Sequence, residues 1–490
     1  MLKQIPENAD MRQLRTQAKE LLQSIKSRHA TYEGVAPETA KLSDAQRLIA
    51  HEYGFPSWPA LVNKVELPQL LEKFGELVYA GKAEELDSLL SKSKLLRKHI
   101  EEPIFPFDSP ALVRAANHPE AQRLIPVLVK HGANPNTPTS WWAGGFTPLS
   151  QATKPAADLL VKLGAKYDTY SAAKQGEAEI LKSLLAQDPD SVNMAGGDGQ
   201  RPLHVAKSAD IAEILCEARA DLEQRDVDHE STPIQYQINN HEVVRGLLRH
   251  GAKPDIYTAI ALDDLELLNQ ILAENPDARN SKIGEGAYKT VSNGAHIYAY
   301  EVGGGKSPLH YAAERQAARL VERLLDGAPA FEQFLAAVWG GEADRSAELL
   351  NAHPEIGQKL TPHNLVEAAE KGNIDGVRVL LAAGVDPTFL THSGTALHAA
   401  CWHGQLATAE ILADVTPLEL RDRQFGATPL SWACHGANWC RDPKGDYPAL
   451  VRVLLKKGAR ADVPANNEGA TMMEIAGNRE DIKAVLESHN

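Results

Sequence analysis

Two segments near the end of the sequence decide the fold: TALHAACWHG at 395–404 and TPLSWACHGA at 428–437. Their first residues, Thr395 and Thr428, lie 33 positions apart. Self-similarity at a period of this length indicates one supersecondary unit that is stacked many times along the chain. The same pattern returns in earlier segments: FTPLSQA at 146–152, RPLHVA at 201–206, STPIQY at 231–236 and SPLHYAAERQ at 307–316.

Each residue of the pattern has a mechanical role in a pair of helices. Thr caps the first (inner) helix, Pro occupies its first turn, and Leu and the paired small residues pack against the second (outer) helix. Gly follows the outer helix, as in RVLLAAGVDP at 378–387, where a left-handed residue turns the chain. Arg219 stands at one such position in place of Gly, which predicts local strain or a looser cap there.

This pattern resembles the ankyrin repeat family, and the resemblance covers about residues 70 to 490. It implies an all-α fold, an ankyrin-repeat solenoid of roughly a dozen helix pairs joined by short hairpin linkers. Some units keep the helix pair without the Thr-Pro-Leu-His signature, such as YSAAKQGEAEILKSLLAQDP from 170 and NLVEAAEKGNIDGVRVLL from 364.

The first 66 residues do not follow the repeat. MRQLRTQAKELLQSIKSRH at 11–29 has its apolar residues at helical spacing, and LSDAQRLIAHEYGFPSWPALVNKVE at 42–66 predicts two shorter helices. The block resembles the helical module that precedes ankyrin arrays in many bacterial proteins. We therefore expect an N-terminal helical module at 1–66 that caps the array at 67–490, with a separate partner site as the alternative.

Composition excludes several classes of protein. The 490 residues carry 51 Lys and Arg against 65 Asp and Glu, a formal charge of −14, which argues against binding to nucleic acid or to an anionic membrane. There is no apolar run long enough to span a membrane and no signal peptide in the first twenty residues. Four cysteines are too few for a disulfide scaffold, so we expect a cytoplasmic protein.

Four insertions depart from the repeat, and they predict where function lies. Shortened inner helices after Thr147, Pro202 and Thr232 predict a dent in the concave wall, over which three of the insertions would lean. In the third insertion the alternation of His296, Tyr298 and Tyr300 predicts a β-hairpin. The four insertions are NTPTSWWAGGF at 136–146, QRDVDHEST at 224–232, the segment 281–307, and ANWCRDPKGDY at 437–447.

The inner helices at the C-terminal end add aromatic and imidazole groups to the same surface. Alignment on the repeat buries Cys401 and Cys434 and places Trp402, His403 and His435 at groove positions. The spacing of Cys434, His435 and Cys440 matches no tight zinc pattern, and packing explains the buried thiols. We therefore expect no metal site and no cofactor.

The carboxylates of the second insertion predict a possible acid–base pair. In an extended loop Asp226, Asp228 and Glu230 point the same way, and an exposed acidic turn is the simpler alternative. Two carboxylates beside aromatic platforms suit hydrolysis of a glycosidic bond, with Asp228 as general base and Glu230 as general acid. The expected ligand-binding residues are Trp141, Trp142, His229, His296, Tyr298, Trp402, His403, His435 and Asp446.

Two functional hypotheses therefore follow from the sequence. The family resemblance implies a recognition protein that holds a partner protein in its concave groove. The insertions favour instead a pocket for a small polar ligand, or a hydrolase that acts on a glycoside. Geometry separates them, because converging insertions over Trp402 and His435 would favour the pocket, whereas a wide, open groove would favour protein binding.

Overall fold

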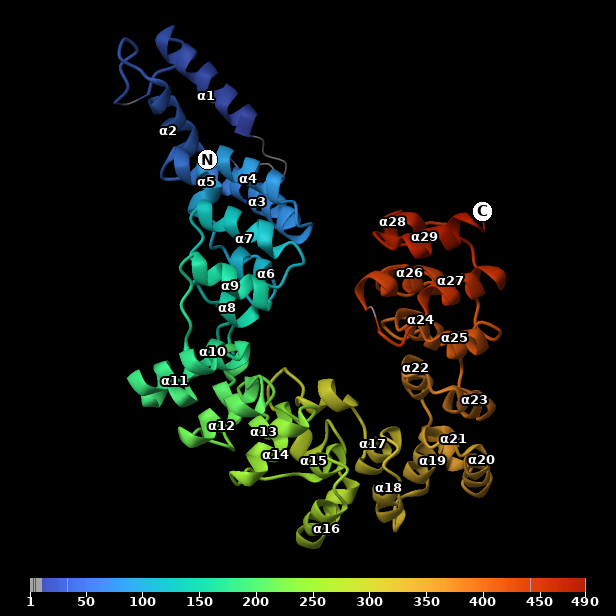
Figure 1. Cartoon of the computed structure of the whole chain (residues 1–490). Helices are drawn as coiled ribbons and strands as arrows, with labels where there is room; N and C mark the ends of the chain where they lie inside the picture. Colours follow the sequence, from blue (N-terminus) through green and yellow to red (C-terminus); the bar gives the residue numbers. More distant parts are fainter. Residues whose placement is uncertain (1–2, 4, 6–10, 33, 441, 490) are drawn as a thin grey trace. The chain divides into compact units, whose positions relative to one another are not determined.

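The computed structural model describes residues 3, 5, 11–32, 34–440 and 442–489, and it is built from helices (Figure 1). Over these residues there is no β-strand, and the predicted all-α fold is confirmed. The helices follow one another in pairs, as the roughly dozen expected units require. No helix in this part of the chain combines the length and the apolar character needed to cross a bilayer.

The chain divides into two compact units. Unit 1 comprises Met1–Lys253 and Thr290–Ile297, and unit 2 comprises Pro254–Lys289 and Tyr298–Asn490. The division passes through the insertion at 281–307, because the middle of that insertion packs in unit 1 while its two ends pack in unit 2. Each unit is described below by itself.

The helices of unit 1 are α1 (Met11–Lys26), α2 (Leu42–Glu52), α3 (Trp58–Tyr79), α4 (Ala83–Lys92), α5 (Lys94–Lys98), α6 (Ala111–Ala116), α7 (Ala121–Lys130), α8 (Pro148–Gln151), α9 (Lys154–Lys162), α10 (Thr169–Gln175), α11 (Ala178–Gln187), η1 (Pro189–Asn193), η2 (Gly197–Gly199), η3 (Pro202–Val205), α12 (Ala209–Glu217), α13 (Pro233–Tyr236) and α14 (His241–Arg249).

The helices of unit 2 are α15 (Ile256–Ala261), α16 (Leu265–Glu274), η4 (Pro276–Asn280), η5 (Gly286–Tyr288), η6 (Ala299–Gly303), α17 (Pro308–Glu314), α18 (Ala318–Leu325), α19 (Ala330–Trp339), α20 (Ala343–Ala352), α21 (Glu355–Lys359), α22 (Pro362–Glu370), α23 (Ile374–Ala382), α24 (Ala396–Trp402), α25 (Leu406–Leu412), α26 (Pro429–Trp439), α27 (Tyr447–Lys456), α28 (Met472–Ala476) and α29 (Glu480–Glu487).

The repeated Thr begins inner helices as the sequence predicts. Thr428 accepts a hydrogen bond from the backbone N–H of Ser431 at 3.3 Å, and Pro429 occupies the first turn of α26. The histidine of the motif joins neighbouring repeats. Nδ1 of His398 accepts from Thr395 N–H, and Nε2 donates to the carbonyl of Ala427 in the next linker. Helix α24 is thereby tied to the hairpin of the following repeat.

Apolar side chains between successive helix pairs form the cores. In unit 2 one continuous core runs from Phe334 to Leu486 and contains the buried thiols of Cys401 and Cys434, as predicted. In unit 1 a core runs from Phe74 to Ala165. Because each pair buries its apolar faces only against its neighbours, the cores are elongated along the stack.

The N-terminal helices form a small core of their own. Met11, Leu14 and Ala18 of α1 pack with Ile49 and Ala50 of α2 against the first half of α3. Helix α3 runs from Trp58 to Tyr79, so it continues through the domain boundary expected after residue 66. Its second half packs in the core of the first repeat, and the module and the array therefore share one helix.

Three local features test the predicted departures. The inner helices α8, η3 and α13 each have four residues, whereas α17 and α24 have seven, so the predicted shortening is confirmed. Arg219 adopts φ +66°, the left-handed conformation usually taken by Gly after an outer helix. The β-hairpin predicted for 281–307 is wrong: the segment contains the short helical turns η5 and η6, and the helical backbone from Tyr298 onward breaks the alternation.

Candidate functional site

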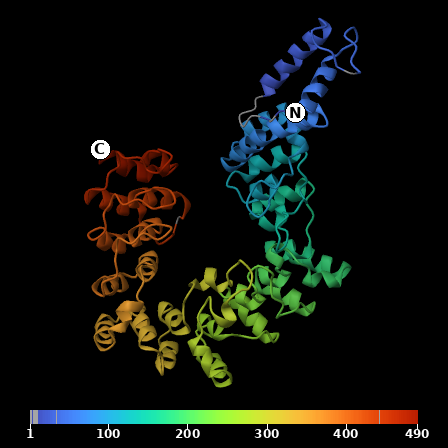
Figure 2. The same ribbon diagram turned by 180° about the vertical axis from the view of Figure 1, so that it is seen from behind.

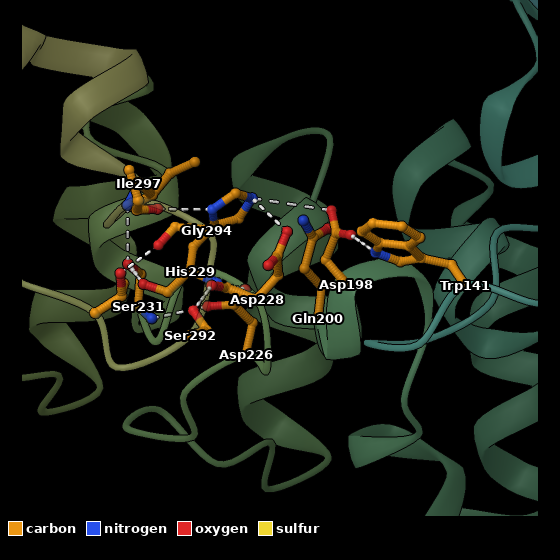
Figure 3. Close-up of polar contacts among 12 residues, drawn as sticks. Trp141, Asp198, Gln200, Asp226, Asp228, His229, Ser231, Ser292, Gly294 and Ile297 are labelled. Atoms are coloured by element: carbon orange, nitrogen blue, oxygen red, sulfur yellow. Dashed lines mark hydrogen bonds and ion pairs between the residues drawn. The ribbon is translucent and has the colours of Figure 1, made fainter. Parts of the chain in front are cut away.

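Four loop segments of unit 1 meet around one imidazole (Figure 3). They are the insertion that carries Trp141, the turn at Gly197–Gly199, the acidic loop at 226–231, and Thr290–Ile297. Backbone hydrogen bonds hold the turn and the acidic loop together, since Val227 N–H and Asp228 N–H both donate to the carbonyl of Asp198 at 2.9 and 3.2 Å. The cluster is thus assembled from the linkers of neighbouring repeats within unit 1.

Glycines allow these loops to approach closely. A Cβ atom on Gly197 would lie 2.0 Å from the ring of Phe146, and one on Gly144 would lie 2.3 Å from the carbonyl oxygen of Gly196. A Cβ atom on Gly294 would lie 2.6 Å from the Asp228 carboxylate. Larger residues at these positions would push the segments apart.

Asp226 is the anchor of the acidic loop. Its carboxylate accepts hydrogen bonds from the backbone N–H of His229 at 2.8 Å and of Ser231 at 2.7 Å, and from the hydroxyl of Tyr236 at 2.9 Å. The side chain is buried. These three bonds account for its acceptor atoms, so Asp226 stabilises the loop rather than facing a groove.

Glu230 has a similar structural role. It adopts φ +49°, and its Oε1 atom accepts from the backbone N–H of Val291 at 2.8 Å and of Ser292 at 2.9 Å. The loop turns at this residue. The prediction that Asp226, Asp228 and Glu230 point the same way is therefore wrong, because alternation requires an extended backbone that the left-handed Glu230 interrupts.

The remaining polar groups converge on His229. Its Nδ1 atom donates to the carbonyl of Ala295 at 2.8 Å, and its Nε2 atom lies 3.9 Å from Oδ2 of Asp228 and 4.0 Å from Oδ2 of Asp198. The other oxygen of Asp198 accepts from Nε1 of Trp141 at 2.9 Å. Burial raises the pKa of Asp198, and the His229 imidazole acts in the opposite direction.

The other residues predicted in the insertions are divided among different roles. Trp142 contacts the Trp141 ring and is 55 % exposed. His296 is buried in unit 1. Tyr298 is buried in unit 2, where its hydroxyl donates to Asp255 and its ring stacks on Tyr288. Tyr298 is therefore a core residue, which corrects its assignment to a ligand site.

Unit 2 contains a separate groove of about 670 Å³. Figures 1 and 2 show the inner helices α22, α24, α26 and α28 stacked beside the outer helices of the same repeats. The groove lies over these inner helices and the linkers that precede them. Its lining residues are His363, Val366, Glu370, Thr391, His392, Ser393, Thr395, Ala399, Trp402, His403, Phe425, Ala427, Ser431, Trp432, His435, Asn466 and Ile475.

Aromatic rings meet edge to face along this groove. The ring centroid of Trp402 lies 5.5 Å from that of Trp432 and 5.5 Å from that of His435. Phe425 lies 6.1 Å from Trp432 and is 46 % exposed. Trp432 donates its Nε1–H to Oδ2 of Asp422 at 2.9 Å, which fixes the ring. Burial lowers the pKa of His435, which favours the neutral imidazole.

His403, at the edge of the groove, has several polar neighbours. Its Nδ1 atom lies 3.5 Å from Sγ of Cys440 and 3.7 Å from Oδ2 of Asp442, and its Nε2 atom lies 3.7 Å from Oε1 of Glu370. Asp446 was expected to bind a ligand, but its carboxylate accepts from Ala449 N–H at 3.1 Å and caps α27. Its assignment is corrected to that of a helix cap.

The structure also brings in residues that sequence reasoning missed. Asp198 lies in the GGDGQ turn at 196–200, one linker before the acidic loop, and alignment of successive linkers is the signal that could have identified it. Phe425 and His392 line the unit 2 groove from linkers that follow the consensus length, so no sequence departure marked them. The predicted residues themselves fall into both units: Asp226, Asp228 and Glu230 in unit 1, and Trp402, His403 and His435 in unit 2.

Comparison with known proteins identifies the repeats. The profile described as "Ankyrin repeats (3 copies)" matches residues 169–258 and 365–442, and the profile "Ankyrin repeat" matches residues 304–332. These three segments therefore match ankyrin repeats, and the predicted all-α ankyrin-repeat fold is confirmed.

Two kinds of curated protein are similar to parts of the chain. "Ankyrin repeat and SAM domain-containing protein 6" of Mus musculus and of Rattus norvegicus is 32 % identical over 90 residues, which is 17 % of this chain and 10 % of the relative. "E3 ubiquitin-protein ligase KEG" of Arabidopsis thaliana is 23 % identical over 326 residues, 63 % of this chain and 18 % of the relative. The chain thus matches only a small share of each relative's length.

Proposed function

We propose that this protein recognises a partner protein, and that the aromatic groove of unit 2 is its binding surface. Ankyrin repeats are interaction modules, which supports the general function. The observation that carries the assignment to this groove is its cluster of partly exposed rings on α24, α26 and the linker that precedes α26: Trp402, Trp432, Phe425 and His435.

The chemistry of the lining indicates the kind of segment that would bind. Aromatic rings and small side chains dominate the groove, and Glu370 is the one carboxylate among the described residues that line it. Tryptophan provides a large rigid contact surface at low cost in side-chain entropy, which is why it is common at the energetic centre of interfaces. The expected partner segment therefore inserts a bulky apolar side chain between Trp402, Trp432 and Phe425.

A peptide selection tests this function. A random peptide library is panned on the full chain, and the affinity of selected peptides is measured by fluorescence anisotropy. Trp402→Ala and Phe425→Ala should each weaken binding at least about tenfold, as truncation of a central interface residue does. Trp142→Ala is the matched control, because Trp142 is an exposed tryptophan of unit 1. Selected peptides whose affinity all three variants leave unchanged would refute the groove assignment.

The glycoside hydrolase hypothesis has little support from the contacts of its own residues. The carboxylates of Asp226 and Glu230 accept hydrogen bonds from backbone amides of the loops, so these two residues do not form the carboxylate pair that hydrolysis of a glycoside needs. The assignment of Asp228 as general base and Glu230 as general acid stays a prediction that these contacts do not favour.

A reducing compartment such as the cytoplasm fits this function. Cys216, Cys401, Cys434 and Cys440 are free thiols, and Cys401 and Cys434 are buried in the same core without a bond between them. Thiols of this kind persist where the environment keeps them reduced.

A further inference from the structure

One side-chain atom each of Asp198, Asp228 and His229 has the spacing expected of the ligand atoms of a slightly expanded metal site. Nε2 of His229 and one carboxylate oxygen each of Asp198 and Asp228 all lie within 4.8 Å of one another. The contacts of 3.9 and 4.0 Å to Nε2 are too long for hydrogen bonds. Ligand atoms of a tetrahedral zinc site, bound at about 2.1 Å, lie roughly 3.4 Å apart. Closure around a cation would thus shorten each of the two contacts to Nε2 by about half an ångström.

The hydrogen bond on the far side of the imidazole sets its orientation. Because Nδ1–H of His229 donates to the carbonyl of Ala295, the ring is held with Nε2 on the side of the two carboxylates (Figure 3). A cation bound there would be attracted by both carboxylates and would be within reach of Nε2. A bond from the second ring nitrogen to a carbonyl is the usual outer contact of a metal-binding histidine.

The carboxylate of Asp198 is also held in a fixed orientation by a hydrogen bond. Its Oδ1 atom accepts from Nε1 of Trp141 at 2.9 Å, which holds the carboxylate while Oδ2 faces His229 (Figure 3). The residue adopts φ +57° in the Gly-rich turn, so a strained backbone conformation is maintained to place this side chain. The turn and the ring together fix one oxygen atom toward the centre of the cluster.

The charge of the cluster also favours a cation. Asp198, Asp226 and Asp228 are all buried within these loops, and in the described part of the chain no Lys or Arg forms an ion pair with any of them. Lys174 interacts electrostatically with Asp198 but forms no ion pair with it in the described part of the chain. Buried carboxylates without an ion-paired Lys or Arg are costly, and a divalent cation offsets that cost.

We propose that Asp198, Asp228 and His229 bind one divalent transition-metal cation, with zinc as the best match. One imidazole nitrogen and two carboxylate oxygens suit zinc or a related first-row ion, whereas magnesium and calcium prefer oxygen ligands alone. The spacing of residues in the sequence predicted no metal site, and Asp198 was not among the predicted site residues. The bound ion would join three linkers of unit 1: the 197–199 turn, the acidic loop and, through Ala295, the segment Thr290–Ile297.

Zinc binding to the full chain tests the proposal. The experiment uses Cys440→Ser as background, because this partly exposed thiol could bind zinc by itself. After treatment with a chelator, equilibrium dialysis against Zn²⁺ followed by elemental analysis should find one ion per chain. Zn²⁺ at about one hundred times its dissociation constant should raise the melting temperature by roughly 5 °C, and Mg²⁺ should not.

Three ligand variants and one control locate the ion. Asp228→Asn, His229→Gln and Asp198→Asn should each lower zinc affinity at least about tenfold. Glu230→Gln is the matched control, because Glu230 lies in the same loop and contacts only the 291–292 amides, and its zinc affinity should be unchanged. Equal zinc content in the background protein and in all three ligand variants would overturn the proposal.

A second measurement does not depend on the folding of the variants. Co²⁺ bound to the background protein should show weak visible bands of nitrogen and oxygen ligation. An intense near-ultraviolet band from thiolate to cobalt would place the metal on a cysteine and would overturn the proposal. Absence of stoichiometric binding would also overturn it.

Discussion

The Sγ atom of Cys440 lies 3.5 Å from Nδ1 of His403, although the two residues belong to different repeats. Cys440 follows the last residue of α26, and His403 follows the last residue of α24. The juxtaposition lies beside the aromatic groove, since His403 and Trp402 both line it. At this distance the thiol can donate a hydrogen bond to the imidazole, and Cys440 is partly exposed, whereas Cys401 and Cys434 are buried.

Cys440 should therefore be the first thiol to react with iodoacetamide in the folded protein. Burial raises the pKa of Cys216 to about 11 and that of Cys434 to about 12, and it raises the pKa of Cys401 as well. Peptide mapping by mass spectrometry after brief alkylation should find the label on Cys440, and His403→Gln should slow its reaction several-fold. Simultaneous labelling of all four thiols without denaturant would contradict this expectation.

The motif histidines should make stability depend on pH. Burial is the main cause that lowers the pKa of His204 and of His398 to about 4, from 6.5 in the unfolded chain. Between these two pH values the unfolded chain binds a proton that the folded protein does not. The stability is thus fully present above about pH 6.5 and falls as the pH drops toward 4.

When the pH is lowered from about 7 to about 5, each of these imidazoles should lower the free energy of unfolding by about 2 kcal/mol. Urea unfolding at the two pH values measures this difference. His398→Gln should reduce the pH dependence by that amount, whereas His363→Gln, at an exposed position, should leave it unchanged. An identical pH dependence in both variants would show that His398 is not the titrating group.

Arg219→Gly should stabilise unit 1. Arg219 adopts φ +66°, and its exposed side chain forms no hydrogen bond or ion pair with the described residues, so glycine relieves backbone strain without removing such a contact. The expected gain in unfolding free energy is about 1 kcal/mol, measured by urea denaturation.

Gly251→Ala is the matched change in the opposite direction. Gly251 follows α14 at φ +94°, and a Cβ atom there would meet no atom within 4 Å, so the backbone alone decides its effect. It should destabilise the protein by about 1 kcal/mol. A loss of stability in Arg219→Gly would mean that the arginine side chain contributes more than its conformation costs.

Removal of residues 1–56 should cause self-association. This cut keeps α3 and its N-cap Ser57 intact, whereas a cut at residue 66 would divide the helix. It uncovers Leu61 and Val65, which are buried against α1 and α2. Light scattering after gel filtration should show oligomers, and Leu61→Gln with Val65→Gln in the truncated chain should restore monomers. A monomeric truncation without these changes would refute the capping role of the module.

Sequence reasoning was most successful where local rules apply repeat by repeat. The 33-residue spacing of Thr395 and Thr428, the buried Cys401 and Cys434, and the shortened inner helices were all predictable, because caps and apolar spacing act within one helix pair. The pairing of Trp402 with His435 was also predictable, because equivalent positions of neighbouring repeats face each other.

The loops were less predictable, for a physical reason. The interpretation of 226–230 assumed an extended backbone, and Glu230 at φ +49° turns the chain instead. The alternation of His296, Tyr298 and Tyr300 suggested a hairpin, but His296 packs in unit 1 and Tyr298 in unit 2. Loop conformation depends on contacts between segments distant in sequence, which residue spacing does not specify.

The sequence by itself determined that the chain is a stack of helix pairs, since periodic caps, prolines and glycines act over a few residues. Only the tertiary structure decided which linkers meet. It places Asp198 beside His229 and Asp228, and Cys440 beside His403, through close approach of loops from different repeats. That approach depends on glycines without side chains and on left-handed residues such as Asp198, whose conformations are stabilised by the packed array and not by their immediate neighbours in sequence.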